Sequence, residues 1–478
     1  MNFVFFFPDE MRAESVSCYG QPLVSMPNYD RLASEGVRFD QCHVQHPVCS
    51  PSRCSLMTGW YPHVSGHRTL WHLLRAHEPS LFRYLDAAGY EIAWHGKNDL
   101  YAPEYFDIID RYDSAAGDNA GPNPYGFEDD PFYSFDYRAC EGGLWETRDA
   151  GNLAQGIEFL RARKADDPPF FLYLPLSKPH PPYSVPEPYH SMYEGADIPP
   201  LRPADLPNKP DYHALIRQYR RLDQLDDDFF RHIQASYLGS CSYVDWMLGE
   251  LLETLDQTGL ANTTTVIASA DHGDWAGDYG LVEKWPSALD DTMTRVPLIV
   301  RAPGQAAGHE VAEPVELFDL MPTVIEMAGL EAQHAHFARS LVPQLGGAAG
   351  DPDRAVFCEG GYDTHEPHCF EGRGSVHALF TRREGIYFPK GLQQQEFPES
   401  VCRATMLRTA THKLVWRPAG VSELYDLVED PLELDNRFDD SSMASVRQEL
   451  TERLLDWTIR TADVTPYDEN PRGLPPTR

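Results

Sequence analysis

The sequence predicts an α/β protein in which helices cover both faces of a large, mostly parallel sheet, followed by a smaller α+β part. Short apolar runs alternate with helical patterns over the first two thirds of the chain. This alternation is typical of parallel sheets, because the crossover helices bury both faces of the strands. The apolar runs that we predict as strands are residues 4–7, 92–94, 170–174, 264–269 and 296–300.

Helices are predicted between these strands from apolar residues at helical spacing and from signals at the helix ends. Three of them have a proline at an early position, where the missing N–H costs no hydrogen bond. Gly36, Gly59 and Gly89 follow predicted helix ends, as glycines in the left-handed conformation do. The predicted helices are residues 27–35, 51–58, 79–88, 153–163, 222–258 and 317–328.

Two segments interrupt the alternation. Residues 101–146 are aromatic, acidic and rich in glycine and proline, and we interpret them as an insertion near the mouth of a site or as a mobile surface loop. Residues 346–353 have the composition of a linker, so we predict a catalytic domain over residues 1–350 and a C-terminal domain over residues 351–478. The C-terminal domain is expected to hold a small antiparallel sheet from residues 406–408, 413–416 and 423–427, and a final helix over residues 443–461.

The composition excludes several classes of protein and partner. Hydrophobic residues make up 42% of the chain and charged residues 24%, which is ordinary for a soluble globular protein. The formal net charge of −33 repels nucleic acids and anionic membranes, so we expect neither as a partner. The apolar run at residues 3–7 is too short for a signal peptide or a membrane span, which predicts a cytoplasmic location. The nine cysteines show no disulfide framework and are expected to be free.

Polar residues follow four of the predicted strands. They are Asp9 and Glu10 after the first strand, Lys97 after the second, His180 after the third, and Asp271 and His272 after the fourth. Ligands bind outside the carboxyl ends of the strands in an open parallel sheet, so we expect these side chains to converge on one crevice. The three carboxylates and the imidazole of His272 suit a hard divalent cation. We predict calcium, with manganese and magnesium as alternatives.

The segment from Cys49 to Gly59 predicts a short helix with Cys49 at its N-terminus and Pro51 near its first position. Unpaired N–H groups and the helix dipole favour an anion at such an end. Arg53, one turn further along, adds a planar donor that suits an oxyanion. A nucleophile at position 49 would therefore attack a tetrahedral anionic group.

Two other interpretations of this cysteine-rich stretch stay open. The first is a zinc site, although the spacing matches no usual C-x₂-C pair. The second is that the cysteines are plain buried thiols. The zinc ligands would be Cys42, His43, His46, Cys49 and Cys54.

The run Cys49-Ser50-Pro51-Ser52-Arg53, with Thr58-Gly59 at the end of the helix, resembles the signature of the type I sulfatases. The resemblance covers nearly the whole chain and implies the alkaline-phosphatase-like α/β fold with a small C-terminal domain. Further matching segments, in family order, are FPDE at residues 7–10, Lys97, KPH at residues 178–180, DHG at residues 271–273, Lys284 and ELYDL at residues 423–427.

The resemblance implies how the nucleophile is made and held. A formylglycine-generating maturation enzyme would oxidise Cys49 to formylglycine, whose hydrated aldehyde attacks the substrate. The formylglycine would share the divalent cation with four side chains of the chain. These are Asp9, Glu10, Asp271 and His272.

The resemblance also implies roles for the cations around this centre. Arg53 would fix the hydrated aldehyde and the carboxylates next to the metal. Lys97 and Lys284 would bind oxygens of the sulfate group. His180 would protonate the leaving oxygen of the ester.

Two positions depart from the family pattern. Many members carry Lys-x-His after the second strand, where the histidine acts on the second hydroxyl of the hydrated aldehyde, and this chain has Asp99 there. Asp99 is one candidate for that base, and His67 and His95 are the others. Glu10 stands where Asp or Gln is more usual, which changes the geometry expected at the cation.

We therefore predict a sulfuric ester hydrolase that acts on a small anionic sulfate ester of a carbohydrate or an aryl alcohol. One alternative is a phosphonate monoester or phosphodiester hydrolase, because that sister class uses the same signature and cation site. Another is a non-catalytic binding module in which Cys49 stays a thiol. Residues 101–146 and 365–394 are predicted to select the leaving group.

Overall fold

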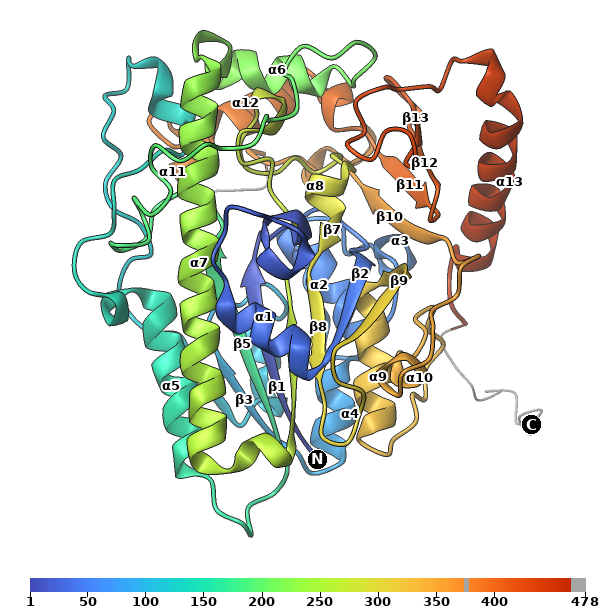
Figure 1. Cartoon of the computed structure of the whole chain (residues 1–478). Coiled ribbons are helices and arrows are strands. Elements are labelled where there is room, and N and C mark those ends of the chain that lie inside the picture. The colour runs from blue at the N-terminus through green and yellow to red at the C-terminus, as the bar shows by residue number, and fades with distance from the viewer. Residues whose placement is uncertain (374–377, 466–478) are drawn as a thin grey trace.

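The computed structural model of the chain describes residues 1–373 and 378–465. A nine-stranded sheet forms its centre, with the strands in the order β4-β3-β5-β1-β6-β8-β2-β7 and with β9 paired to β2 (Figure 1). The strands are β1 Asn2–Asp9, β2 Val37–His43, β3 Glu91–His95, β4 Arg111–Asp113, β5 Phe170–Pro179, β6 Thr264–Ser269, β7 Arg295–Val296, β8 Leu298–Arg301 and β9 His309–Glu316.

The sheet is mostly parallel, as the sequence predicts. Strand β1 lies between β5 and β6 and is parallel to both. Strands β3, β4 and β5 continue the parallel pairing on one side, whereas β8 is antiparallel to both β6 and β2. Residues Phe3 to Phe7 of β1 are all buried, because helices cover both faces of the sheet.

Two groups of helices make these covering layers (Figure 1). The helices are α1 Pro27–Glu35, α2 Cys49–Thr58, α3 Pro62–Ser65, α4 Leu81–Ala87, α5 Arg148–Ala162, α6 Tyr212–Tyr219, α7 Asp227–Thr258, α8 Asp291–Thr294, α9 Leu320–Met327, α10 Val342–Leu345, α11 Ala378–Thr381, α12 Phe388–Glu396 and α13 Ala444–Thr461. Helices α1, α5 and α7 pack together on one face, and α2, α4 and α9 pack together on the other. Within the described residues, no helix combines the length and apolarity needed to cross a membrane.

The predicted helix ends are partly correct. Gly59 and Gly89 have φ angles of 68° and 80°, which is the expected left-handed conformation. Gly36 does not, because its φ is −136°. A Cβ at Gly36 would lie 2.5 Å from the carbonyl oxygen of Val300, so close approach to β8 is what requires glycine there. Helix α2 begins at Cys49, so Pro51 is its third residue rather than its first.

All five predicted strands are present, but the sheet holds more. The run at 296–300 is split into β7 and β8 by Pro297, which has no N–H for the ladder. Strands β2 and β9 were not predicted because polar residues interrupt their apolar ones, so neither sequence has a continuous apolar run. Strand β4 lies inside residues 101–146 and extends the sheet beyond β3, so this insertion is not only a surface loop.

The C-terminal part contains the predicted antiparallel sheet and final helix. Its strands are β10 Val356–Gly360, β11 Ala404–Arg408, β12 His412–Trp416 and β13 Glu423–Asp426. Leu414 of β12 and Trp457 of α13 share a buried cluster with Tyr61 and Phe318 from the earlier part of the chain. The C-terminal sheet therefore packs against the main body through a common core, while the domain boundary at residue 350 stays a prediction. All nine cysteines are free.

Candidate active site

The carboxyl ends of β1 and β6 bring the two acidic clusters together. Phe6 of β1 lies opposite Ala268 of β6, so Asp9 and Asp271, each three residues further along, reach the same level. Ligand atoms of four buried residues lie within 4.8 Å of one another; the residues are Asp9, Cys49, Asp271 and His272. Two carboxylates, a sulfur and an imidazole thus converge at the N-terminus of α2.

His272 presents one ring nitrogen to this cluster. Its Nε2 lies 3.2 Å from Cys49 Sγ, and its Nδ1 lies 2.9 Å from the carbonyl oxygen of Gly273. We assign the proton to Nδ1 because only a donor suits that carbonyl, which leaves a lone pair on Nε2. A Cβ at Gly273 would lie 1.9 Å from the carbonyl oxygen of Thr292, so the turn after His272 requires glycine.

The donor set fits a hard divalent cation. Asp9 and Asp271 supply carboxylate oxygens, and neutral imidazole is a common companion ligand. Glu10 falls in a second group of candidate ligands, with Asp9 and His180. Its Oε1 is buried without a hydrogen-bond partner among the described residues, which is the state expected of an oxygen reserved for a cation. Ligation by Glu10 stays a prediction.

Arg53 holds the two central carboxylates from one side. Its Nε donates to Asp271 Oδ2 at 2.9 Å, and its Nη2 donates to Asp9 Oδ2 at 2.7 Å. The guanidinium is buried and lies over the ring of Phe7, 5.2 Å from its centroid. Arg53 therefore makes the contacts with the carboxylates that the resemblance implies.

Lys97, two residues beyond the end of β3, approaches one of these carboxylates, Asp9. Its Nζ lies 2.6 Å from Asp9 Oδ2, 2.9 Å from Asp99 Oδ2 and 3.7 Å from Cys49 Sγ. Burial raises the pKa of Asp9, but the positive charges of Lys97 and Arg53 outweigh burial and hold that pKa well below its usual range. Asp9 is therefore ionised, and its carboxylate oxygens can bind a cation.

His180 and Lys284 face each other on the other side of Glu10. Lys284 Nζ lies 2.6 Å from Glu10 Oε2 and 2.8 Å from His180 Nε2. Burial and the charge of Lys284 hold the pKa of His180 well below its usual range, so the ring is neutral. Its Nδ1 lies 2.6 Å from the carbonyl oxygen of Pro181 and carries the proton, so Nε2 accepts from Lys284.

Two alternative bases lie outside this cluster. The ring nitrogens of His67 lie 2.7 Å from the carbonyl oxygen of His72 and 3.0 Å from Glu78 Oε2, so the ring faces these groups rather than the cluster. The charged neighbours of His95 are Asp113 and Arg111, at the outer edge of the sheet. Asp99 contacts Lys97 and is the one of the three that reaches the cluster.

The alternative zinc set is not assembled. Of the five residues in that set, only Cys49 lies close enough to other possible ligands to form a metal site, among the described parts of the chain. Burial, reinforced by Asp9, raises the pKa of the Cys49 thiol well above its usual range. An unmodified Cys49 would therefore be a neutral thiol.

Sequence reasoning missed one group of residues behind Lys284. Glu283 is buried with a φ of 64°, and it forms ion pairs with Lys390 and Arg220. Lys390 lies on α12, more than 100 residues further along, and no local motif marks it. In the sequence Lys390 is only an isolated lysine, and its burial becomes apparent in the structure.

Comparison with known proteins identifies the family. A family model for sulfatases matches residues 1–330. The chain belongs to the sulfatase family. It is 28% identical to the multifunctional alkaline phosphatase superfamily protein PehA of Trinickia caryophylli, over 98% of this chain and 96% of the relative. It is also 28% identical to human iduronate 2-sulfatase, over 73% of this chain and 69% of the relative.

Solved structures share the fold of this chain. The phosphonate monoester hydrolase of Agrobacterium radiobacter superposes with a TM-score of 0.77 at 24% identity and covers 96% of both chains. The structure of BT4656 in complex with D-glucosamine-2-N,6-O-disulfate gives a TM-score of 0.74 at 21% identity, over 96% of this chain and 98% of that chain. The predicted fold is thus confirmed, and the family supports hydrolysis of sulfate esters in general.

Proposed function

We propose that the protein is a metal-dependent sulfuric ester hydrolase whose nucleophile is formylglycine at position 49. The observation that carries this proposal is the place of Cys49. Its Sγ lies 3.5 Å from Asp9 Oδ1 and 3.2 Å from His272 Nε2, at the positive end of α2. A neutral buried thiol is a poor nucleophile there, whereas a hydrated aldehyde would place a hydroxyl next to a cation.

The cation and the formylglycine would each supply part of the chemistry. A divalent cation would polarise the sulfate and make the attacking hydroxyl more acidic. Formylglycine would supply that hydroxyl and a second one, whose proton loss expels sulfate with the bonding electrons and restores the aldehyde. An ordinary cysteine would instead form a thiosulfate ester with no second hydroxyl to release it.

The chain's own residues bind the sulfate and serve the leaving group. The side chains of Lys97 and His180 are 25% and 19% exposed, whereas Asp9 and Arg53 are buried, so the substrate approaches from the side of Lys97 and His180. Lys97 and Lys284 would bind sulfate oxygens on opposite sides of the cluster. His180 is neutral with its proton on Nδ1, so the ammonium of Lys284 would supply the proton and Nε2 of His180 would pass it to the leaving oxygen.

The proposed substrate is a sulfate monoester of a carbohydrate or an aryl alcohol. We assign residues 101–146 a role in selecting the substrate. One contact supports this role: the carbonyl oxygen of Tyr133, which lies in that stretch, accepts a hydrogen bond from Arg220. Arg220 in turn pairs with Glu283, the neighbour of Lys284. Arg220 therefore links residues 101–146 to the residue next to Lys284.

A second candidate function is hydrolysis of phosphonate monoesters or phosphodiesters. It is favoured by the similarity to a phosphonate monoester hydrolase over 96% of both chains. The two functions are separated by kcat/KM on an aryl sulfate, an aryl phosphonate monoester and an aryl phosphodiester that share one leaving group. We expect the sulfate to be preferred. A higher value on either phosphorus ester would favour the second candidate, and turnover of none would favour the non-catalytic interpretation.

A further inference from the structure

Lys284 lies on a segment, Glu283 to Ser287, that has no regular secondary structure. Residues of the C-terminal part bond to nearly every position of this segment. Lys390 Nζ lies 2.8 Å from Glu283 Oε1, and Trp285 Nε1 donates to the carbonyl of Ser400 at 2.8 Å. Gly361 N donates to the carbonyl of Pro286 at 2.8 Å. Arg417 Nη1 donates to the carbonyl of Ser287 at 2.9 Å. The C-terminal part therefore holds the segment that presents Lys284.

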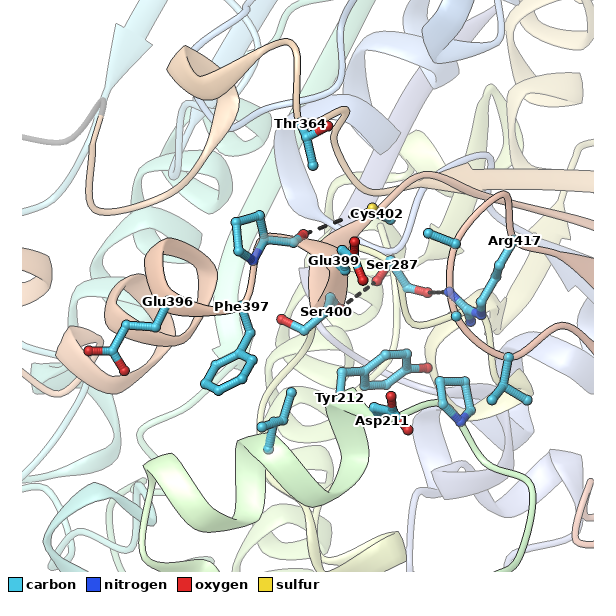
Figure 2. Close-up of a pocket in the computed structure, with 16 residues that line it drawn as sticks. Asp211, Tyr212, Ser287, Thr364, Glu396, Phe397, Glu399, Ser400, Cys402 and Arg417 are labelled. Atoms are coloured by element: carbon cyan, nitrogen blue, oxygen red, sulfur yellow. Dashed lines mark hydrogen bonds between the residues drawn. The ribbon is translucent and has the colours of Figure 1, made fainter.

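The segment borders a cavity at its last residue, Ser287. This cavity of about 350 Å³ is lined by Ser287, Ser400 and Arg417 among others (Figure 2). Figure 2 shows Ser287 hydrogen-bonded to both Ser400 and Arg417 at the edge of this cavity. Hydrogen bonds from the C-terminal part therefore hold Ser287 at the edge of the cavity, while Trp285 is buried in the core.

Glu283 is the most constrained residue of the segment. It is 2% exposed, and its φ of 64° is the left-handed conformation that non-glycine residues rarely adopt. Lys390 pairs with its Oε1, and Arg220 Nη2 lies 3.1 Å from its Oε2. Such a backbone persists only when surrounding contacts over-determine it.

The charge of Glu283 also competes for Lys284. Lys284 Nζ lies 3.8 Å from Glu283 Oε1, compared with 2.6 Å from Glu10 Oε2. Lys390 is bonded to the same Oε1 of Glu283 and so neutralises the oxygen nearest Lys284. Without Lys390, a buried carboxylate oxygen would be left without its partner beside the ammonium of Lys284.

We propose that Lys390 is a positioning residue for Lys284: by occupying Glu283, it leaves Lys284 directed at Glu10 and His180. The inference rests on the proposed role of Lys284 in binding sulfate. It assigns a part in the reaction to a helix, α12, that lies beyond the residues matched by the sulfatase family model.

The test compares Lys390→Met, Glu283→Gln and the double variant. Lys390→Met should lower kcat/KM about 10- to 100-fold, as loss of a supporting partner does at a metal site. The double variant should recover most of this loss, because the competing charge is gone. Removing the unpaired carboxylate would also restore stability, so the position of Lys284 in the variants, described below, is what separates positioning from a purely structural role. Lys413→Met is the matched control, since Lys413 is an equally buried lysine, paired with Asp291 and Glu433, without contact to the segment.

Crystal structures of the same variants test the proposal without any assay of turnover. In Lys390→Met, Lys284 should leave Glu10 and His180 and bond to Glu283, and in the double variant it should stay in place. An unmoved Lys284 in Lys390→Met, or a displaced one in the double variant, overturns the proposal. The double variant has no unpaired carboxylate at position 283, so it can be tested even if Lys390→Met does not fold. Failure of the proposed function would instead appear as absent sulfatase turnover in the wild type with Lys284 moving as described.

Discussion

The two sides of the candidate site are built in different ways. On the cation side, Asp9 ends β1, Asp271 follows the adjacent parallel strand β6, and Cys49 begins a helix. On the leaving-group side, Lys284 lies on an irregular segment that Lys390 and Arg417 hold from the C-terminal part. Regular secondary structure places the residues of the first side, whereas the second side depends on contacts between residues more than a hundred positions apart. The cation side should therefore be the more robust to change elsewhere in the molecule.

The largest effects are expected on the cation side. Cys49→Ala and Asp271→Asn should each lower kcat by several orders of magnitude while the protein stays folded, because nucleophile and metal serve one step. Their losses should be grossly non-additive, as for residues that act as a unit. Steady-state kinetics with circular dichroism as a folding control tests this. Near-normal turnover by Cys49→Ala would end the formylglycine proposal.

The two lysines allow a direct comparison of the two sides. Lys97→Ala and Lys284→Ala should each cost about 2–4 kcal/mol of transition-state stabilisation, as lost charge contacts in such sites do. Only the Lys284 effect should grow as the leaving alcohol becomes less acidic, because Lys284 is bonded to His180. The measurement is kcat/KM across a series of aryl sulfates. If both variants gave parallel dependences on leaving group, the division of roles would be wrong.

Asp99 should give the smallest effect. Its Oδ2 lies 2.9 Å from Lys97 Nζ, which indicates a partner of that lysine rather than the base for the second hydroxyl. We expect Asp99→Asn to change kcat by less than about tenfold, whereas loss of a general base costs about 10²–10⁴-fold. A loss of about 10²–10⁴-fold in kcat would instead identify Asp99 as the base that acts on the second hydroxyl.

The sequence predicted the cation side better than the leaving-group side for a physical reason. Asp9 ends a strand, Lys97 and Asp271 each follow one, and a parallel sheet brings these strand ends together. Strands β2 and β9 were not predicted because polar residues interrupt their apolar ones, so neither has a continuous apolar run.

The support of Lys284 could not be predicted in the same way. Lys390 and Glu283 meet only after α12 has packed against the main body, and neither carries a local signature of pairing. The conformation of Glu283 gives no warning either, since nothing in its sequence neighbourhood demands a positive φ. Family resemblance identified Lys284 itself, but not the residues that hold it.

The central claim is that position 49 carries an aldehyde in the active protein. Mass spectrometry of the peptide that contains Cys49 tests it most directly, with protein made in a host that has a formylglycine-generating enzyme. We expect a peptide that is lighter than the encoded one and reacts with a hydrazide, and kcat should rise in proportion to the fraction of this modified peptide. A fully active preparation in which Cys49 is unmodified and alkylated by iodoacetamide would contradict it.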